Sequence, residues 1–230
     1  MVAAVSTRSS TKPANTLVAR DLRLDRGARS IISGLSFTIG SGRALILRGA
    51  NGSGKTSLLR ILAGLTLPDA GEIQWNGEKL KALSAKWRAA ALYLGHTNAL
   101  KDDLSAQENL LDALAIDGVT AAPVAQLAAL DKVGLLDRRQ IPARRLSQGQ
   151  KRRVGLARLS LALSHMPHKP LWLLDEPTNA LDRDGVALFT SLISEHLGNG
   201  GIACIATHLV LSLTSPVTEM NLDSLVEATA

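Results

Sequence analysis

The fold of this chain is decided by one stretch, Gly49-Ala50-Asn51-Gly52-Ser53-Gly54-Lys55-Thr56, which fits the P-loop pattern G-x4-G-K-[ST]. A strand pattern over 43–48 precedes it and a helical pattern over 55–62 follows it. Glycines let a backbone fold around phosphate with its N–H groups pointing inward, and the helix start adds the positive end of a dipole. A chance glycine-rich turn would not need this strand–loop–helix order. We therefore predict that the stretch binds a nucleotide triphosphate.

Individual side chains of the P-loop have separate expected tasks. Lys55 is expected to reach the β- and γ-phosphates, and the Thr56 hydroxyl to ligate Mg²⁺. The predicted nucleotide-binding set covers every residue from Gly49 to Ser57. ATP and Mg²⁺ are the expected cofactors.

A second candidate site follows an apolar strand pattern, Leu171-Trp172-Leu173-Leu174, which ends in Asp175 and Glu176. The carboxyl ends of strands in an open α/β sheet form the usual ligand edge. Asp175 suits contact with Mg²⁺ through a water molecule, and Glu176 suits a general base that polarises the attacking water. Alone, two acids could simply mark a solvated strand end; beside a P-loop they predict a catalytic pair.

A third candidate lies in Leu146-Ser147-Gln148-Gly149-Gln150, about a hundred residues after the P-loop. Ser147 and Gln150 have the spacing of a capping box at the start of a helix. An exposed helix start, with Gly149 permitting close approach, is also an anion site. Spacing alone does not separate a plain cap from a ligand site.

The wider pattern predicts an α/β fold with a mainly parallel sheet, since strand patterns alternate with helical ones. With 46% apolar residues among 230, the chain is large enough for a packed domain of this class. The expected strands cover 17–24, 35–39, 43–48, 72–75, 90–94, 171–174 and 201–206. The expected helices cover 55–62, 105–116, 123–133, 147–163 and 182–197. The first 15 residues lack acids and are rich in small and polar residues, which predicts a flexible tail; a transit peptide is the alternative.

Composition and charge limit the classes of partner that this chain is expected to bind. The net charge of +6 would suit nucleic acid or an acidic membrane surface, but the basic residues come in short clusters and aromatics make up only 3%. We expect no nucleic-acid partner. No apolar run approaches the ~20 residues that cross a bilayer, so another polypeptide would have to form any transport path. The single cysteine, Cys204, lies in an apolar run and is expected to be buried.

These motifs, in this order, resemble the ATP-binding cassette (ABC) family over nearly the whole chain. The stretch 146–150 resembles its signature motif, Asn179-Ala180-Leu181-Asp182 its D-loop, and His208 its switch histidine. The resemblance implies a P-loop NTPase (RecA-like) core with an antiparallel β subdomain and an inserted helical subdomain at about 94–161. This nucleotide-binding domain would span 16–230.

The resemblance also implies how the residues work together. Two domains would stack head to tail, so that each ATP lies between the P-loop of one copy and Ser147, Gly149 and Gln150 of the other. His208 would hold the γ-phosphate and the attacking water. The implied catalytic residues are Glu176, His208 and Lys55.

Two positions depart from the family pattern. Arg26 stands where the family usually has an aromatic residue that stacks on adenine; its guanidinium plane could stack instead. His96 or Thr97 stands where the family has a glutamine that senses Mg²⁺ and the membrane partner. His96 is retained in the expected nucleotide-binding set.

Smaller patterns resemble one subfamily, the ATP-binding subunits of the cytochrome c maturation (heme export) complex. They are Gly34-Leu35-Ser36-Phe37, Gly95-His96, Gly149–Val154 and Leu156-Ala157-Arg158-Leu159. This resemblance implies a homodimer bound to integral membrane permease subunits at the cytoplasmic face of the inner membrane. The partners, rather than this chain, would handle heme.

Three other functions remain open from the sequence. The chain could serve a transporter for another substrate, act on DNA or ribosomes as a soluble ABC ATPase, or gate a partner without hydrolysis. His165 and His168 could also bind a metal or heme, although a proline-containing surface loop explains them without a ligand.

Overall fold

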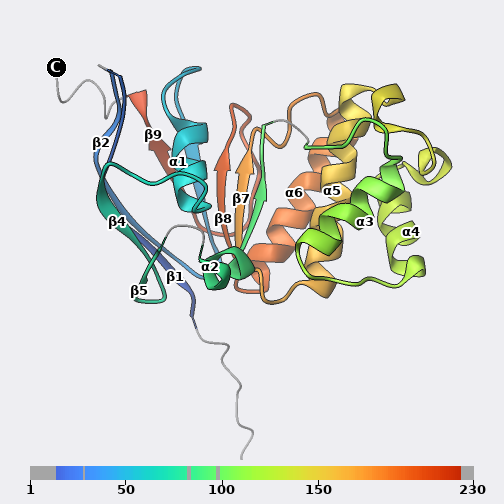
Figure 1. Cartoon of the computed structure of the whole chain (residues 1–230), viewed down its shortest axis with the longest axis horizontal. Helices are drawn as coiled ribbons and strands as arrows, with labels where there is room; N and C mark the ends of the chain where they lie inside the picture. The colour runs from blue at the N-terminus through green and yellow to red at the C-terminus, as the bar shows by residue number, and fades with distance from the viewer. Residues whose placement is uncertain (1–13, 28, 82–83, 97–98, 224–230) are drawn as a thin grey trace, which may run out of the picture.

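The structure is a computed structural model that describes residues 14–27, 29–81, 84–96 and 99–223 (Figure 1). Of the tail predicted over 1–15, only Ala14 and Asn15 fall within the described residues. The backbone N–H of Asn15 donates to Ser41 Oγ at 2.6 Å. The chain therefore enters the fold beside Ser41, directly before the first strand.

A five-stranded parallel sheet forms the centre of the molecule. In spatial order its strands are β6 (Ala91–Leu94), β7 (Leu171–Asp175), β8 (Ile202–Ala206), β3 (Arg43–Arg48) and β9 (Val217–Asn221). Every residue of β7 and β8 is buried, which explains their continuous apolar runs. The strands predicted at 43–48, 90–94, 171–174 and 201–206 are confirmed to within one residue at each end.

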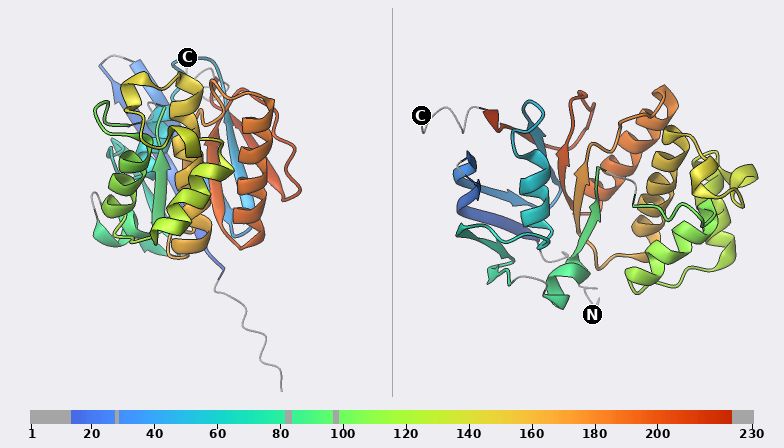
Figure 2. Two further views of the ribbon diagram at one scale, coloured as in Figure 1. Left: turned by 90° about the vertical axis from the view of Figure 1, so that its right-hand side faces the viewer. Right: turned by 45° about the horizontal axis from the view of Figure 1, so that its top comes forward.

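The two faces of this sheet bury two separate apolar cores, because successive side chains of a strand point to opposite faces. Trp172 and Leu174 pack into the core shared with the larger helices. Leu171 and Leu173 pack into the core beneath helix α1 (Lys55–Leu62) and the second sheet. Figure 2 shows these layers on the two sides of the central sheet.

The second sheet is antiparallel, with four strands in the order β2-β1-β4-β5. These are β2 (Arg29–Gly40), β1 (Thr16–Arg26), β4 (Ala70–Trp75) and β5 (Glu78–Lys79). The predicted strands 17–24, 35–39 and 72–75 lie inside β1, β2 and β4. β2 starts earlier than predicted because residues 29–32 pair with the end of β1, a contact that local patterning does not reveal.

The larger helices lie on the other side of the parallel sheet (Figure 1). They are α3 (Ala106–Ile116), α4 (Pro123–Lys132), α5 (Gln148–His165) and α6 (Arg183–Gly198), with the short 3-10 helices η1 (Leu136–Arg138) and η2 (Ala143–Arg145) between α4 and α5. Both predicted capping boxes are present, at Ser105 before α3 and at Ser147 before α5. The predicted helices are confirmed; α3, α4 and most of α5 fall in the stretch 94–161 proposed as a helical subdomain, whereas α6 lies outside it.

Besides the two 3-10 helices, the sequence did not predict α2 (Ala85–Ala90), β5 and β9. Ala90, which the sequence placed at the start of a strand, ends helix α2 instead. Helix α2 forms here because Trp87 anchors it. Trp87 is 5% exposed, and its indole N–H donates to Leu62 O at 2.8 Å. A tertiary contact therefore holds this helical turn in place.

Candidate functional site

A cleft of about 780 Å³ lies beside the P-loop, at the carboxyl edge of the parallel sheet. Its lining combines the P-loop, the two acids that follow β7, and the β1–β2 hairpin. The lining residues are Arg26, Ile31, Asn51, Gly52, Gly54, Lys55, Thr56, Ser57, Arg60, His96, Asp175 and Glu176. The structure thus brings together, in one cavity, most of the residues predicted to hold nucleotide, magnesium and water.

The P-loop requires glycine at specific places. Gly49, Gly52 and Gly54 have φ angles of 134°, 86° and 100°, a region that other residues rarely adopt. A Cβ on Gly54 would also lie 2.9 Å from Cγ2 of Ile31, and one on Gly49 would lie 2.5 Å from Oγ of Ser53. The loop backbone is therefore tightly curved, and it also packs too closely against neighbouring atoms to leave room for a side chain at Gly49 or Gly54.

Lys55 is buried in the loop that precedes it, with 7% of its surface exposed. Its Nζ donates to Gly49 O at 2.6 Å and to Ala50 O at 3.0 Å. The ammonium group thus sits across the mouth of the loop, where an incoming phosphate would meet a positive charge. Ser53 Oγ is buried without a hydrogen-bond partner.

Asp175 and Thr56 form the candidate magnesium site. Thr56 Oγ1 donates to Asp175 Oδ2 at 2.9 Å, and Asp175 Oδ1 is buried without a partner. A hydroxyl and a carboxylate are the oxygen ligands that Mg²⁺ takes beside phosphates. A metal ion, or a water bound to it, would therefore satisfy this buried and unpaired oxygen of Asp175.

Glu176 and His208 meet at the cleft. His208 Nε2 lies 3.3 Å from Glu176 Oε1, and Glu176 Oε2 is buried without a partner. Glu176 has a φ of 47°, and its N–H donates to Ala206 O at 2.9 Å. This strained backbone turns the carboxylate toward the histidine, as expected for a pair that handles water and phosphate.

The loop that carries His208 is held by Arg48, at the end of β3. Arg48 Nη1 donates to the carbonyls of Thr207 and Leu209, on either side of the histidine, at 2.6 and 2.8 Å. His208 itself remains 57% exposed at its side chain. The backbone is thus fixed while the imidazole is free to contact a ligand.

Ser147, Gly149 and Gln150 do not line the cleft of their own chain. Gln150 N donates to Ser147 Oγ at 3.2 Å, and Ser147 N donates to Gln150 Oε1 at 2.9 Å. A Cβ on Gly149 would lie 2.7 Å from Ala180 O, so this glycine is also needed for packing against its own D-loop. The start of α5 is therefore an exposed helix end apart from the P-loop.

The D-loop is tied to α5 by an ion pair. Arg153 Nη2 contacts both carboxylate oxygens of Asp182, at 2.6 and 2.9 Å. Asp182 also caps α6 by accepting from Gly185 N at 2.9 Å, and this bond, together with Arg153, lowers the pKa of its carboxyl. The pair keeps the signature motif and the D-loop in one fixed arrangement.

Sequence reasoning missed three residues beside the nucleotide cleft. Arg60 and Ile31 line it, and the carboxylate of Asp223 accepts from Ala50 N at 3.1 and 2.9 Å. Arg60 lies four residues after Thr56, so helical spacing could have placed it on the same face. Asp223 comes after β9 and belongs to no recognisable motif. Only the tertiary fold brings it to the P-loop.

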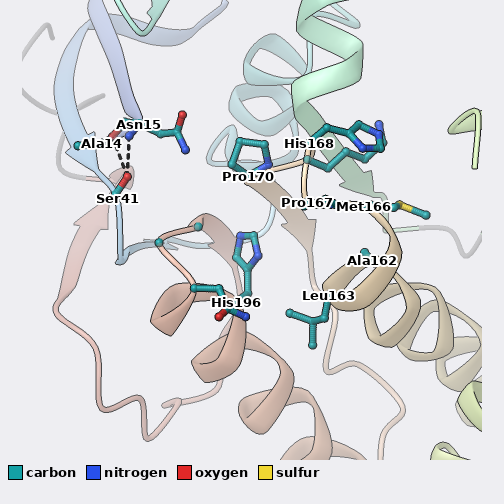
Figure 3. A pocket seen from close by; sticks show the side chains of 14 residues that line it. Ala14, Asn15, Ser41, Ala162, Leu163, Met166, Pro167, His168, Pro170 and His196 are labelled. Carbon is teal, nitrogen blue, oxygen red and sulfur yellow. Dashed lines mark hydrogen bonds between the residues drawn. The ribbon is translucent and has the colours of Figure 1, made fainter. Parts of the chain in front are cut away.

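A second cavity, of about 610 Å³, lies at the opposite end of the sheet (Figure 3). His196 lines it and stacks on Trp172, with ring centroids 3.9 Å apart. Burial lowers the pKa of His196 to about 4. No cluster of three metal-ligating side chains occurs among the described residues, so His168 at this cavity has no metal partners there. Cys204 is buried as predicted, and burial raises the pKa of its thiol to about 12.

A P-loop, an acid pair at the end of a buried strand, and a capped helix start outside the cleft are together typical of an ATPase of the cassette class. The model of the family described as ABC transporter matches residues 32–179, and the chain belongs to this family. It is therefore an ATP-binding subunit with ATPase activity, and the predicted fold class is confirmed.

Several curated relatives are named cytochrome c biogenesis ATP-binding export protein CcmA. The protein from Nitrosomonas europaea is 43% identical over 203 residues, which cover 88% of this chain and 93% of the relative. The protein from Rhodopseudomonas palustris is 45% identical over 199 residues, covering 86% and 94%. These matches agree with the predicted subfamily resemblance.

Solved structures share the fold. A bacterial ABC transporter cassette solved as a dimer superposes with a TM-score of 0.74 at 22% identity, covering 90% of this chain and 94% of the other. A dimeric cassette bound to ADP and phosphate gives 0.71 at 24% identity, covering 84% and 88%. Within the described part of the chain, no helix is both long and apolar enough to cross a membrane.

Proposed function

We propose that this chain is the Mg-ATP-hydrolysing subunit of a membrane complex for cytochrome c biogenesis. The observation that carries the catalytic part is the 3.3 Å contact between His208 and Glu176 at a cleft lined by Lys55. The relatives that match most of the chain at 43–45% identity support the biological setting. Heme is proposed to be handled by the membrane partners.

Each residue of the site has a proposed task. Lys55 and the inward-pointing amides of 49–57 bind the phosphates, and Thr56 and Asp175 hold Mg²⁺, Asp175 through water. Mg²⁺ would neutralise charge on the phosphates. Glu176 accepts a hydrogen bond from the attacking water and polarises it. His208 contacts the γ-phosphate and keeps that water in line with the phosphorus atom.

The site becomes complete only in a dimer. Ser147 and Gly149 lie outside their own cleft, at an exposed helix start, which is a kind of site that suits an anion. A second copy, stacked head to tail, would bring its own α5 start to the phosphates. We propose this homodimer, bound to integral membrane permease subunits at the cytoplasmic face of the inner membrane.

The test is an affinity purification of tagged Glu176→Gln protein from its native membranes in mild detergent with Mg-ATP. Mass spectrometry of the co-purifying chains should recover membrane proteins of cytochrome c maturation. Recovery of a different permease would leave the ATPase role and remove the cytochrome c setting. Recovery of no membrane protein would contradict the transport role and favour a soluble ABC ATPase.

The hydrolytic part is tested separately by steady-state ATPase measurements on the purified wild-type chain. Magnesium-dependent turnover is the expected result. Nucleotide binding without turnover, alone and with its membrane partners, would instead favour a module that gates its partner.

A further inference from the structure

Arg152, in the second turn of α5, is a buried cation that the proposed mechanism has not used. Only 4% of its surface is exposed. Burying a guanidinium group is costly unless its donors and its charge are both satisfied. Its surroundings therefore reveal what the protein gains from placing an arginine there.

The guanidinium group is bonded to the end of strand β6. Nη2 donates to His96 O at 2.9 Å, and Nη1 donates to Gly95 O at 3.3 Å. His96 lines the nucleotide cleft, and it also lines a hollow beside the start of α5 that includes Gln148 and Arg152. The two bonds thus connect the signature helix to the wall of the nucleotide cleft.

Arg152 also lies within electrostatic reach of Asp175 and Glu176. Burial lowers the pKa of Arg152, and the carboxylates of Asp175 and Glu176 oppose that effect. Each of these acids keeps one buried oxygen without a hydrogen-bond partner. The electrostatics of Arg152 are thus coupled to the two acids that the proposed mechanism uses.

We propose that Arg152 is a positioning residue for ATP hydrolysis, which fixes the Gly95–His96 backbone at the wall of the nucleotide cleft. The inference rests on the proposed ATPase mechanism. The contacts go to backbone carbonyls, so they do not depend on which side chain the loop carries. The two hydrogen bonds fix the cleft wall in the loop where His96 or Thr97 replaces the family glutamine.

Arg158, on the same helix, provides a matched comparison. Its guanidinium also reaches β6, where Nη1 approaches Tyr93 O at 3.4 Å, and it pairs with Asp117 at 2.7 Å. Neither arginine lines the nucleotide cleft, but Arg152 bonds to His96, which lines it, whereas Arg158 bonds to Tyr93, which does not. A general need for arginine between α5 and β6 would therefore affect both positions, whereas a role in hydrolysis would affect Arg152 alone.

The experiment compares Arg152→Met, Arg152→Lys and Arg158→Met in the purified full chain, with kcat from steady-state ATPase assays and melting temperature from circular dichroism. Nucleotide affinity is measured by calorimetry with each change added to Glu176→Gln. We expect Arg152→Met to lower kcat about tenfold or more while the Kd for ATP changes less than about threefold. Arg152→Lys should recover part of kcat, because lysine keeps the charge and loses the two-pronged bond. Arg158→Met should lower the melting temperature and keep most of kcat.

Two results would overturn the proposal: an unchanged kcat in Arg152→Met, or an equal loss of kcat in Arg158→Met. Should Arg152→Met fail to fold, Arg152→Lys decides, since wild-type turnover in that variant would contradict a need for the fork. Absence of turnover in the wild type would reject the proposed function itself, and with it this role.

Discussion

Glu176 has three energetically unfavourable features that a purely structural residue would avoid. Its carboxylate is buried, one oxygen lacks a partner, and its backbone has a φ of 47°. Such costs persist where the surrounding structure enforces them for a function. The contact with His208 and the position in the cleft support the proposed function of Glu176, activation of water.

We predict that Glu176→Gln lowers kcat at least about a hundredfold, because general-base groups contribute on the order of 10²–10⁴ to rate. The amide has the shape of the carboxylate but cannot accept a proton. ATP affinity, measured by calorimetry, should stay close to that of the wild type. Glu195→Gln, an exposed change on α6, is the matched control and should leave kcat unchanged. Wild-type turnover in Glu176→Gln would remove Glu176 from catalysis.

His196 gives a second residue-scale prediction, on stability. Its pKa falls from 6.5 to about 4 in the folded chain because of burial. The unfolded chain therefore binds a proton more readily, so the stability that neutral His196 provides is present above pH 6.5 and is lost as pH falls toward 4. Between pH 7 and pH 4.5 this loss amounts to about 2 kcal/mol.

We predict that His196→Gln removes most of that pH dependence, since glutamine can still donate to Ile202 O and does not titrate in this range. Urea unfolding at pH 7 and pH 4.5 measures the free energy of unfolding in both proteins. His168→Gln, on the exposed loop, controls for the loss of one histidine. An undiminished difference between the two pH values in His196→Gln would show that another group causes it.

At the scale of elements, the start of α5 has two interpretations that its sequence could not separate. As a cap, Ser147 satisfies the N–H groups of its own helix; as an anion site, it would also serve a partner's nucleotide. Aspartate caps helices about as well as serine but carries a negative charge. The substitution Ser147→Asp therefore keeps the first role and opposes the second.

We predict that Ser147→Asp leaves the melting temperature within a few degrees of the wild type while ATPase turnover falls about tenfold or more, through repulsion of the phosphates. Ser105→Asp changes the other capping box, which lies away from the nucleotide cleft, and should keep the turnover of the folded protein. Equal turnover in Ser147→Asp and wild type would leave Ser147 as a plain helix cap.

Elements with strong local signals could be predicted from the sequence, and elements that depend on tertiary contacts could not. β3 and α1 occur at the predicted residues because an apolar run and the P-loop specify them locally. β9 is mostly exposed at the sheet edge and owes its position to pairing with β3, so its sequence carries no strand pattern. The contacts of Arg152 and Asp223 with the cleft arise for the same reason from folding.

At the scale of the whole molecule, the proposed site is divided between two exposed parts of one chain. The P-loop and its acids line the cleft, whereas Ser147 and Gly149 lie outside it. Two chains stacked head to tail would each combine their P-loop with the other's signature motif. Defects in the P-loop and in the signature should therefore complement each other across chains.

We predict this complementation for Lys55→Ala, which removes the P-loop cation, and Ser147→Asp. In a mixed dimer both defects fall in the same composite site, because the Lys55→Ala P-loop faces the Ser147→Asp signature. The second site then combines an intact P-loop with an intact signature, so a mixture should hydrolyse ATP faster than either variant alone. The two variants are mixed at increasing ratios and turnover is measured by phosphate release. A site contained within one chain would instead give only the average of the two variants at every ratio, which would contradict the shared site.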